Sequence, residues 1–518
     1  MDAEAVEPIP KKARDQWEWE EEPRAFKSNL LAVFPEPNYT RFKEMSPSDL
    51  FTELFDDGIM SVMAEKSNEY GMSKFGLTAN ITSEDIQAFL CILLLSGYNH
   101  VTDYKMYWSN SLDTENLMVK KAISRDRFLL IKRCFHLGVP VNRQPADGDT
   151  PDRYKKVRVL VDHLQAKFGE LYVPEQCLSH DEAMIKYFGK CGLKQSMRNK
   201  PIRFGFKVWV LATVSGFVVS FDLYQGKGLG LHTTENVKAV GAAGASVLDV
   251  LDLMPEGKRK LPYHIFADNF FSSQKLIDVL LEKNYQYTGT IRQDRVKGKP
   301  PLTSVDKFKK MARGYHETVV LKDQSQIITR WNDNAPVTMI SSILGDQPMR
   351  TASRYLRTAK NYTDIPQPHI VHQYNNYMGG VDRFDQNNNH IRVTIGGKKW
   401  YWSVVTWLLD TAVQNAWQLH KKAGGSMSLL AFKREVVCTT LRSVGTNRSR
   451  HSSGSSGRIG QRPGDADLRY DRLSHFVEKR TLRRECAMEG CKVKVATYCD
   501  KCDRAVCINH FKAYHILG

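Results

Sequence analysis

The sequence predicts an α/β protein with a mixed sheet and flanking helices, a helical N-terminal region and a cysteine-rich C-terminal module. Helix start signals dominate the first third of the chain. Strand-like runs rich in branched and aromatic residues replace them from about Val173 onward. Five of the ten cysteines fall between Cys486 and Cys507. At 518 residues, the chain has room for about three domains.

Charge and composition indicate an intracellular protein that binds a polyanion. The formal net charge is +17, which favours a partner such as nucleic acid. We find no apolar run that could span a bilayer and no secretory signal, so we predict no membrane association. Residues 1–35 are acidic and lack periodicity, which predicts a mobile tail. Within them, Pro10 to Arg14 fits a nuclear localisation signal or, about equally, a solvated basic stretch; we predict a nuclear protein.

Helices are predicted through residues 36–172. Ser46 offers an N-cap, followed by Pro47 at the first helical position and Asp49 in the first turn. Ser83 and Ser124 open two further helices in the same way. Residues 401–420 have apolar side chains at helical spacing, a pattern more often found in a core than in a functional site.

Five strands are predicted over residues 173–292, enough for a mixed sheet. Ser215-Gly216 separates two of them and is a hairpin signal. The five strands are residues 206–213, residues 217–224, residues 287–291 and the runs at Asp181 and Asp268. Three shorter strands at residues 318–321, 327–331 and 337–340 predict a β-rich segment over residues 293–372.

Three aspartates, Asp181, Asp268 and Asp382, stand where a strand or helix end can aim their carboxylates at a common point. Mg²⁺ prefers oxygen ligands and takes one or two protein carboxylates plus substrate phosphate oxygens. Asp385 follows Asp382 by three residues, so on a helix the two carboxylates share a face. The alternative is that each acid caps a helix or turn, the commoner role of a lone aspartate. In a basic chain, the three acids together predict a metal-dependent nuclease.

Four blocks around these acids resemble the piggyBac-type transposases and the proteins domesticated from them. The blocks are Asp181-Glu182 followed by Tyr187-Phe188-Gly189, residues 199–207 (Asn-Lys-Pro-Ile-Arg-Phe-Gly-Phe-Lys), residues 268–273 (Asp-Asn-Phe-Phe-Ser-Ser) and residues 379–386 (Gly-Gly-Val-Asp-Arg-Phe-Asp-Gln). They occur in the order in which that family has them. The resemblance runs from about Ser46 to the C-terminus.

The resemblance implies an RNase H-like catalytic domain in two parts, residues 173–292 and 373–392, separated by an insertion domain over residues 293–372. Divalent Mg²⁺ or Mn²⁺, two ions in all, would be bound by Asp181, Asp268 and Asp382, and Asp385 is a fourth motif acid. Since none of these acids is missing, the resemblance favours a working enzyme over a relative that has lost them.

The resemblance also implies a homodimer. A helical region for dimerisation and DNA binding would comprise residues 36–172, completed by residues 393–437. Residues 438–473 are rich in Arg, Ser and Gly and predict a basic flexible linker, either a plain spacer or a source of sequence-independent phosphate binding.

Residues 474–518 are predicted to bind structural zinc. Cytosolic and nuclear compartments keep thiols reduced, so clustered cysteines there indicate metal before disulfides. Two tetrahedral ions need eight ligands, although any one histidine could be a plain surface residue. The resemblance implies an interleaved cross-brace that reads the transposon end, a role that Lys479, Arg480, Arg483 and Arg484 would suit. The predicted ligands, whose pairing the sequence leaves open, are His475, Cys486, Cys491, Cys499, Cys502, Cys507, His510 and His515.

Outside the predicted zinc-binding module, we predict DNA contacts from basic residues near the acids, where a phosphate backbone would pass. A merely solvated face would have the same pattern. Trp331 and Trp400 could stack on an unpaired base, although core packing is the commoner role of such residues. The candidate DNA contacts are Lys194, Arg198, Lys200, Arg203, Lys207, Arg392, Lys398 and Lys399.

The sequence therefore predicts a piggyBac-like DNA transposase, or a domesticated derivative with intact acids, that cuts and joins double-stranded DNA at transposon ends and TTAA targets without a small-molecule cofactor. A nuclear DNA-binding protein that recognises ends and no longer cuts is the alternative. A general RNase H-like nuclease fits the acids but leaves the cysteine cluster unexplained.

Overall fold

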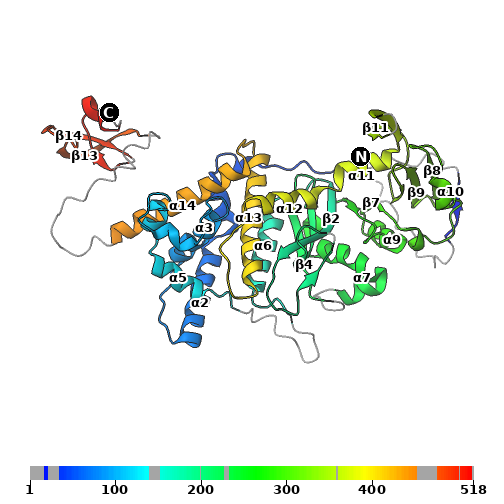
Figure 1. The fold of residues 1–518 in the computed structure, drawn as a ribbon, viewed down its shortest axis with the longest axis horizontal. Helices are drawn as coiled ribbons and strands as arrows, with labels where there is room; N and C mark the ends of the chain where they lie inside the picture. The colour runs from blue at the N-terminus through cyan, green and yellow to red at the C-terminus, as the bar shows by residue number, and fades with distance from the viewer. Residues whose placement is uncertain are drawn as a thin grey trace, which may run out of the picture. The chain divides into compact units, whose positions relative to one another are not determined.

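A computed structural model describes residues 17–21, 34–138, 152–198, 200–226, 233–357, 360–451, 475–500 and 502–515. The chain divides into two compact units, Met1–Ser449 and Arg450–Gly518. Figure 1 shows the fold of each. In the described part of the chain, no helix is both long and apolar enough to cross a membrane.

The described part of residues 36–171 consists mostly of helices, as predicted, although Thr82 and not Ser83 is the N-cap of the third. Ser46 caps the first of them by a capping box: its hydroxyl accepts the Asp49 N–H, and the Asp49 carboxylate accepts the Ser46 N–H. The Ser124 hydroxyl accepts the Arg127 N–H at the start of the fifth. The helices are α1 (Pro47–Leu54), α2 (Asp57–Phe75), α3 (Ser83–Leu95), α4 (Leu117–Ala122), α5 (Arg125–Cys134) and α6 (Arg158–Leu171).

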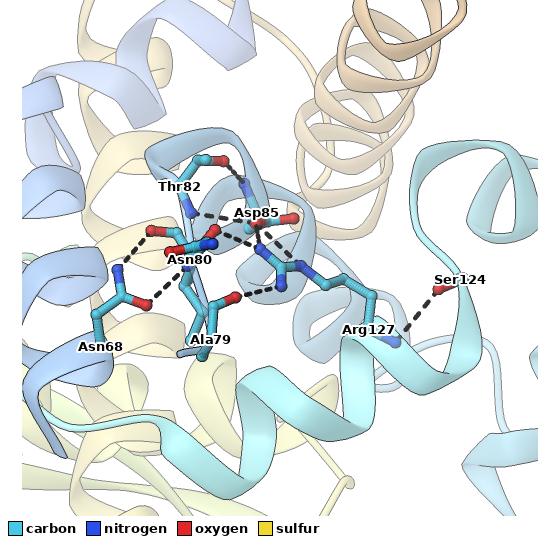
Figure 2. Close-up of polar contacts among 8 residues, drawn as sticks. Asn68, Ala79, Asn80, Thr82, Asp85, Ser124 and Arg127 are labelled. Atoms are coloured by element: carbon cyan, nitrogen blue, oxygen red, sulfur yellow. Dashed lines mark hydrogen bonds and ion pairs between the residues drawn. The ribbon is translucent and has the colours of Figure 1, made fainter. Parts of the chain in front are cut away.

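A buried ion pair ties α5 to the start of α3 (Figure 2). The Asp85 side chain is 3% exposed, and the Arg127 guanidinium donates to its Oδ2 at 2.5 and 3.2 Å. Arg127 also donates to the backbone carbonyls of Ala79 and Asn80, both at 2.6 Å. Because one guanidinium satisfies a carboxylate and two turn carbonyls, it fixes the approach of α2, α3 and α5.

Two later helices complete this helical part, α13 (Trp402–Lys422) and α14 (Leu429–His451). The predicted linker from residue 438 is therefore wrong up to His451, because Val437, Leu441 and Val444 continue the helical spacing and are buried. Residues 452–474, the rest of that predicted linker, lie outside the described residues.

A ten-stranded mixed sheet forms the other part of the first unit. Its centre has the order β5-β4-β2-β6-β7, in which β2 pairs parallel with β6, and β6 pairs parallel with β7. The predicted hairpin is β4 and β5, joined through Ser215-Gly216. All five predicted strands are present: β2 (Cys177–Lys186), β4 (Phe204–Thr213), β5 (Val218–Leu223), β6 (His264–Ala267) and β7 (Gln286–Thr290).

The β-rich segment does not form a sheet of its own, contrary to what a separate insertion domain suggests. Its first strands extend the central sheet beyond β7, because β10 pairs antiparallel with β7 over Met339 to Ser341. Only the hairpin of β11 and β12 stands apart. The strands are β8 (His316–Leu321), β9 (Ile327–Asn332), β10 (Pro336–Ser341), β11 (Arg350–Leu356) and β12 (Asn361–Gln367).

Part of the predicted mobile tail is ordered against this sheet. Strand β1 (Trp19–Glu20) pairs antiparallel with β8, and the Trp19 indole donates to the Lys297 carbonyl at 2.8 Å. Residues 1–16 and 22–33, which include Pro10 to Arg14, lie outside the described residues.

Helices pack on both faces of the central strands (Figure 1). The buried His180 ring contacts the Ser246 hydroxyl of α7 (Thr233–Asp252) at 3.2 Å, so His180 faces α7. Ser179 faces the other side, because a Cβ added to Gly380 of α12 (Gly380–His390) would lie 2.4 Å from the Ser179 hydroxyl. Alternation along the strand puts the side chain of Asp181 on the face of α12. The shorter helices are α8 (Glu256–Arg259), α9 (Gln274–Glu282), α10 (Val305–Phe308) and α11 (His369–Tyr377).

The second unit is small. It contains a three-stranded sheet and a short helix around a core of Cys486, Val506 and Tyr514. Its elements are β13 (Val477–Glu485), β14 (Lys494–Cys499), β15 (Arg504–Ala505) and α16 (Ile508–Tyr514).

Candidate metal and DNA site

The parallel pairing of β2 and β6 aligns the first two predicted acids. His180 is the register partner of Ala267, and each is followed at once by an acid, Asp181 and Asp268. The chain turns after Asp268 because its carboxylate accepts the Phe270 N–H at 2.8 Å. The predicted strand, acid and helix succession is present, since Ser273 then caps α9.

Helix α12 brings the third acid to the same strands. It packs on β2 and β4, and Gly380 lies so close to Ser179 and Thr213 that a side chain there would collide with them. Asp382 is exposed in the first turn, where the helix dipole favours a negative charge. Asp385, half-buried, follows one turn later on the same helix, as predicted.

The acids interact with one another electrostatically. Burial raises the pKa of Asp181 to about 7; Glu182 and Asp268 add to the rise, while Lys200 opposes it. Burial likewise raises the pKa of Asp385 to about 7, with Asp382 and Asp181 adding to the rise. Burial also raises the pKa of Asp268. Clustered carboxylates disfavour each other's charged form, and this repulsion adds to the effect of burial.

Two lysines and a fifth carboxylate, that of Glu182, complete the polar site. Lys200 Nζ lies 3.2 Å from Glu182 Oε1 and 3.8 Å from Asp181 Oδ2. Lys207 Nζ lies 3.8 Å from Glu182 Oε2. Glu182 was not among the predicted site residues, because strand alternation assigns neighbouring side chains to opposite faces. The only sequence signal for it was its position next to Asp181.

Tyr374 of α11 is a second residue that the sequence did not single out. Burial raises its pKa to about 12, and the charges of Asp268, Asp181 and Asp382 add to the rise. Its phenol therefore lies within electrostatic range of all three predicted acids. No motif in the sequence marks this tyrosine.

The other predicted DNA contacts fall into two groups. Lys399 is held inside the protein, donating to the carbonyls of Phe135 at 2.7 Å and Arg133 at 3.1 Å, while Lys194 donates to the Gly189 carbonyl at 2.9 Å. These contacts give both lysines a structural role, and contact with DNA stays a prediction. The half-buried Arg392 contacts Asn389 at 3.4 Å. The exposed members are Arg198, Arg203 and Lys398.

Of the two candidate stacking tryptophans, Trp331 is buried and Trp400 is half-buried. Trp331 is 2% exposed, and its indole donates to the Pro366 carbonyl at 2.9 Å. Trp400 packs with its ring centroid 5.9 Å from both Tyr154 and Phe206. Base stacking by Trp331 is therefore wrong, since burial leaves its ring no room for a base.

In the second unit, all eight predicted zinc ligands gather in two groups of four. Within each group, one potential ligand atom per residue lies within 4.8 Å of the others. Along the chain, the first and last ligands, His475 and His515, belong to one group. Between them come two ligands of the other group, two of the first and again two of the other, which is the interleaving that a cross-brace requires. The groups are His475, Cys499, Cys502 and His515, and Cys486, Cys491, Cys507 and His510.

The spacing in these groups suits a tetrahedral ion. His475 Nδ1 lies 3.3 Å from Cys499 Sγ and 3.4 Å from Cys502 Sγ, and His510 Nδ1 lies 3.2 Å from Cys507 Sγ. Ligands at tetrahedral zinc distances are roughly 3.5 Å apart. Burial acts to raise the pKa of Cys486, but the backbone N–H donors of Cys507 and Met488 act against it, and the pKa is lowered to about 7. These groups could therefore hold metal.

Comparison with known proteins identifies the family. A family model described as Transposase IS4 matches residues 46–417. The human PiggyBac transposable element-derived protein 3 is 36% identical over 471 residues, which cover 91% of this chain and 76% of that protein. The human PiggyBac transposable element-derived protein 2 is 34% identical over 476 residues, covering 92% and 77%.

The fold is also that of a solved structure. The cryo-EM structure of a piggyBac transposase synaptic complex with hairpin DNA matches with a TM-score of 0.63 at 19% identity, over 91% of this chain and 97% of that one. The extent of the sequence matches goes well beyond the blocks around the acids. The chain belongs to the piggyBac transposase family.

Proposed function

We propose that this chain is a DNA transposase, or a domesticated derivative with intact acids, that cuts DNA at transposon ends and joins it to TTAA targets. The observation that carries this proposal is the convergence of acids from β2, from the end of β6 and from the first turn of α12. A solved relative in fold was captured in a synaptic complex with hairpin DNA, which supports double-stranded DNA as the partner here.

Asp181, Asp268 and Asp382 would hold two Mg²⁺ or Mn²⁺ ions, with Asp385 on the same helix face as Asp382. Such ions, when bound, stabilise the attacking and leaving oxygens of a phosphoryl displacement. The protein's own part is positioning. The Phe270 N–H orients Asp268, the Glu182 N–H donates to Asp181 at 2.8 Å, and close packing at Gly380 fixes α12.

The second unit would bind two structural Zn²⁺ ions and read the transposon end. The two four-ligand groups support this role, as do the cations of β13, which include Lys479, Arg483 and Arg484. We extend the proposal to a nuclear homodimer in which residues 36–172 and 393–437 serve dimerisation and DNA binding. In each subunit of this dimer, the catalytic domain would comprise residues 173–292 and 373–392. Residues 293–372 would interrupt it.

A second function, recognition of ends without cutting, is favoured by one observation. The matched human relatives are described as transposable element-derived proteins, a description of origin that does not require activity. Such a protein would keep the zinc module and the DNA-binding surface.

The proposal is tested by measuring DNA cleavage and DNA binding side by side on a cognate transposon end. Asp181→Asn, Asp268→Asn and Asp382→Asn each replace a carboxylate with a weak neutral ligand of the same size. Each is expected to abolish Mg²⁺- or Mn²⁺-dependent strand cleavage, while the affinity for DNA stays within about threefold, since phosphate contacts dominate binding.

The matched control is Asp306→Asn, which removes an exposed carboxylate in the first turn of α10 and should leave cleavage unchanged. Normal cleavage by the three variants would show that these acids are not the catalytic set. If the wild-type protein binds its end with Mg²⁺ present and cuts nothing, the second function is correct.

A further inference from the structure

The acids of the proposed catalytic site already have a cation of the protein's own beside them. The Lys200 ammonium lies 3.8 Å from Asp181 and 3.2 Å from Glu182. These carboxylates are only 15% and 12% exposed, whereas the Lys200 side chain is 29% exposed. The lysine therefore reaches from the solvent side into a more buried pair of acids.

The neighbouring lysine is held quite differently. Lys207 belongs to β4, and its ammonium lies 3.9 Å from the ring centroid of Trp209 and 4.9 Å from that of Phe270. Two aromatic faces and Glu182 together fix its position. It remains a counter-ion for Glu182 whatever happens at Asp181.

Lys200 has no comparable anchor in the described residues. It lies between β3 (Gln195–Ser196) and β4, outside both strands, and its ion-pair partners there are Asp181 and Glu182. A flexible lysine stem outside regular structure can move its charge by rotation about its side-chain bonds alone.

We infer that Lys200 is an internal counter-ion that competes with the divalent cation for Asp181 and leaves when that cation binds. This inference rests on the proposed function. An ammonium within 4 Å of Asp181 weakens the coordination of a divalent ion there, because two cations beside one carboxylate repel each other. Unit charges about 4 Å apart interact by about 4 kcal/mol at an effective dielectric constant of about 20.

The competition links metal binding to DNA binding. An ammonium displaced from Asp181 keeps its charge and is released at the entrance of the acid site, where a DNA phosphate can take it up. Without DNA, the same ammonium returns to Asp181 and weakens the site for metal. The lysine thus makes tight metal binding depend on the presence of substrate.

Mn²⁺ binding to the full-length, zinc-loaded protein without DNA tests the inference. Free Mn²⁺ is measured by electron paramagnetic resonance at pH 8; Mn²⁺ does not displace zinc from thiolate sites. Lys200→Met and, as a second neutral variant, Lys200→Gln are each expected to tighten Mn²⁺ binding about tenfold, since a charge this close commonly shifts a carboxylate equilibrium by one pKa unit or more.

Two control variants separate charge from other effects. Lys200→Arg keeps the charge and should stay within about twofold of the wild-type affinity. Lys190→Met removes an exposed lysine from the chain before Lys200, and it should bind Mn²⁺ as the wild type does. Unchanged or weaker Mn²⁺ binding in both neutral Lys200 variants overturns the inference.

Asp181→Asn distinguishes this failure from failure of the proposed function. If Asp181→Asn binds Mn²⁺ as tightly as the wild type, the acids are not the metal site, and the proposed function falls together with the inference. If Asp181→Asn loses Mn²⁺ while the neutral Lys200 variants match the wild type, only the counter-ion role is wrong.

Discussion

Single residues in this protein show how burial sets the charge that a group can carry. The buried acids of the site hold their protons more tightly than free aspartate, because desolvation and mutual repulsion both penalise the carboxylate. Burial has the opposite effect on the pKa of histidines elsewhere in the protein, which it lowers. The clearest of them is His136, which lies far from the acids in the sequence and contacts none of the proposed metal ligands in the described structure.

His136 is built into the helical part in its neutral form. Its ring stacks on Tyr70 with centroids 4.8 Å apart, and its Nδ1 accepts the Gly138 N–H at 2.9 Å. Burial lowers the pKa of His136 to about 4; the nearby Lys399 and Lys156 lower it further, and Glu69 opposes them. An unfolded histidine titrates near 6.5, so the unfolded chain binds the proton first on acidification.

Stability from His136 is therefore present above pH 6.5 and lost as the pH falls toward 4. We expect the wild-type protein to lose about 1–2 kcal/mol more between pH 7.5 and pH 5 than His136→Gln, which cannot titrate. Urea unfolding at the two pH values measures the difference. An equal loss in both proteins would mean that the fold does not lower the pKa of His136.

At the scale of elements, one buried ion pair holds α12, α13 and α14 together. Lys433 of α14 donates to Asp410 of α13 at 2.8 Å and to the Ile391 carbonyl, just after α12, at 2.6 Å. Asp410 also accepts the Val393 N–H at 2.8 Å. The side chains of Lys433 and Asp410 are 2% and 6% exposed. The end of the helix that carries two of the proposed catalytic acids is thus fixed from the helical part.

Lys433→Met is expected to destabilise the first unit by about 3–5 kcal/mol, because it leaves the Asp410 carboxylate buried without its cation. Adding Asp410→Leu should recover much of this loss, since an apolar pair of similar volume can replace a buried ion pair. Arg434→Met, at the next, exposed position of the same helix, serves as the control and should change little. Thermal unfolding followed by circular dichroism measures all three, and a Lys433→Met protein as stable as the control contradicts the role of this pair.

The elements also show what a sequence can predict. Strands β2 and β4, the cap of α1 and the helix that carries Asp382 and Asp385 were predicted because their signals are local. The pairing of β1 with β8, the joining of β10 to β7 and the burial of Lys433 were not, since each depends on residues far apart in the chain. The same distinction holds for the site. Sequence motifs identified the acids, whereas the contact between Lys200 and Glu182 could not be predicted without the folded structure.

At the scale of the whole molecule, the two units differ in what holds them folded. The first has an extensive apolar core shared by its helices and sheet. The second has a small core and two groups of metal-ligating side chains. We expect a module of this size, with so few buried apolar residues, to depend on metal for its fold.

We therefore expect about two Zn²⁺ per chain by metal analysis, and selective unfolding of the second unit on chelation. After treatment with 1,10-phenanthroline, limited proteolysis should degrade residues 475–515, while a fragment within residues 34–451 persists and helical circular dichroism is largely kept.

The chelated protein should lose its preference for a transposon-end sequence. It should still bind duplex DNA with an affinity that falls steeply with salt, because this part of binding comes from counterion release at phosphates. A metal-free tail that resists protease, or an equal sequence preference before and after chelation, would contradict the zinc module as the reader of the end.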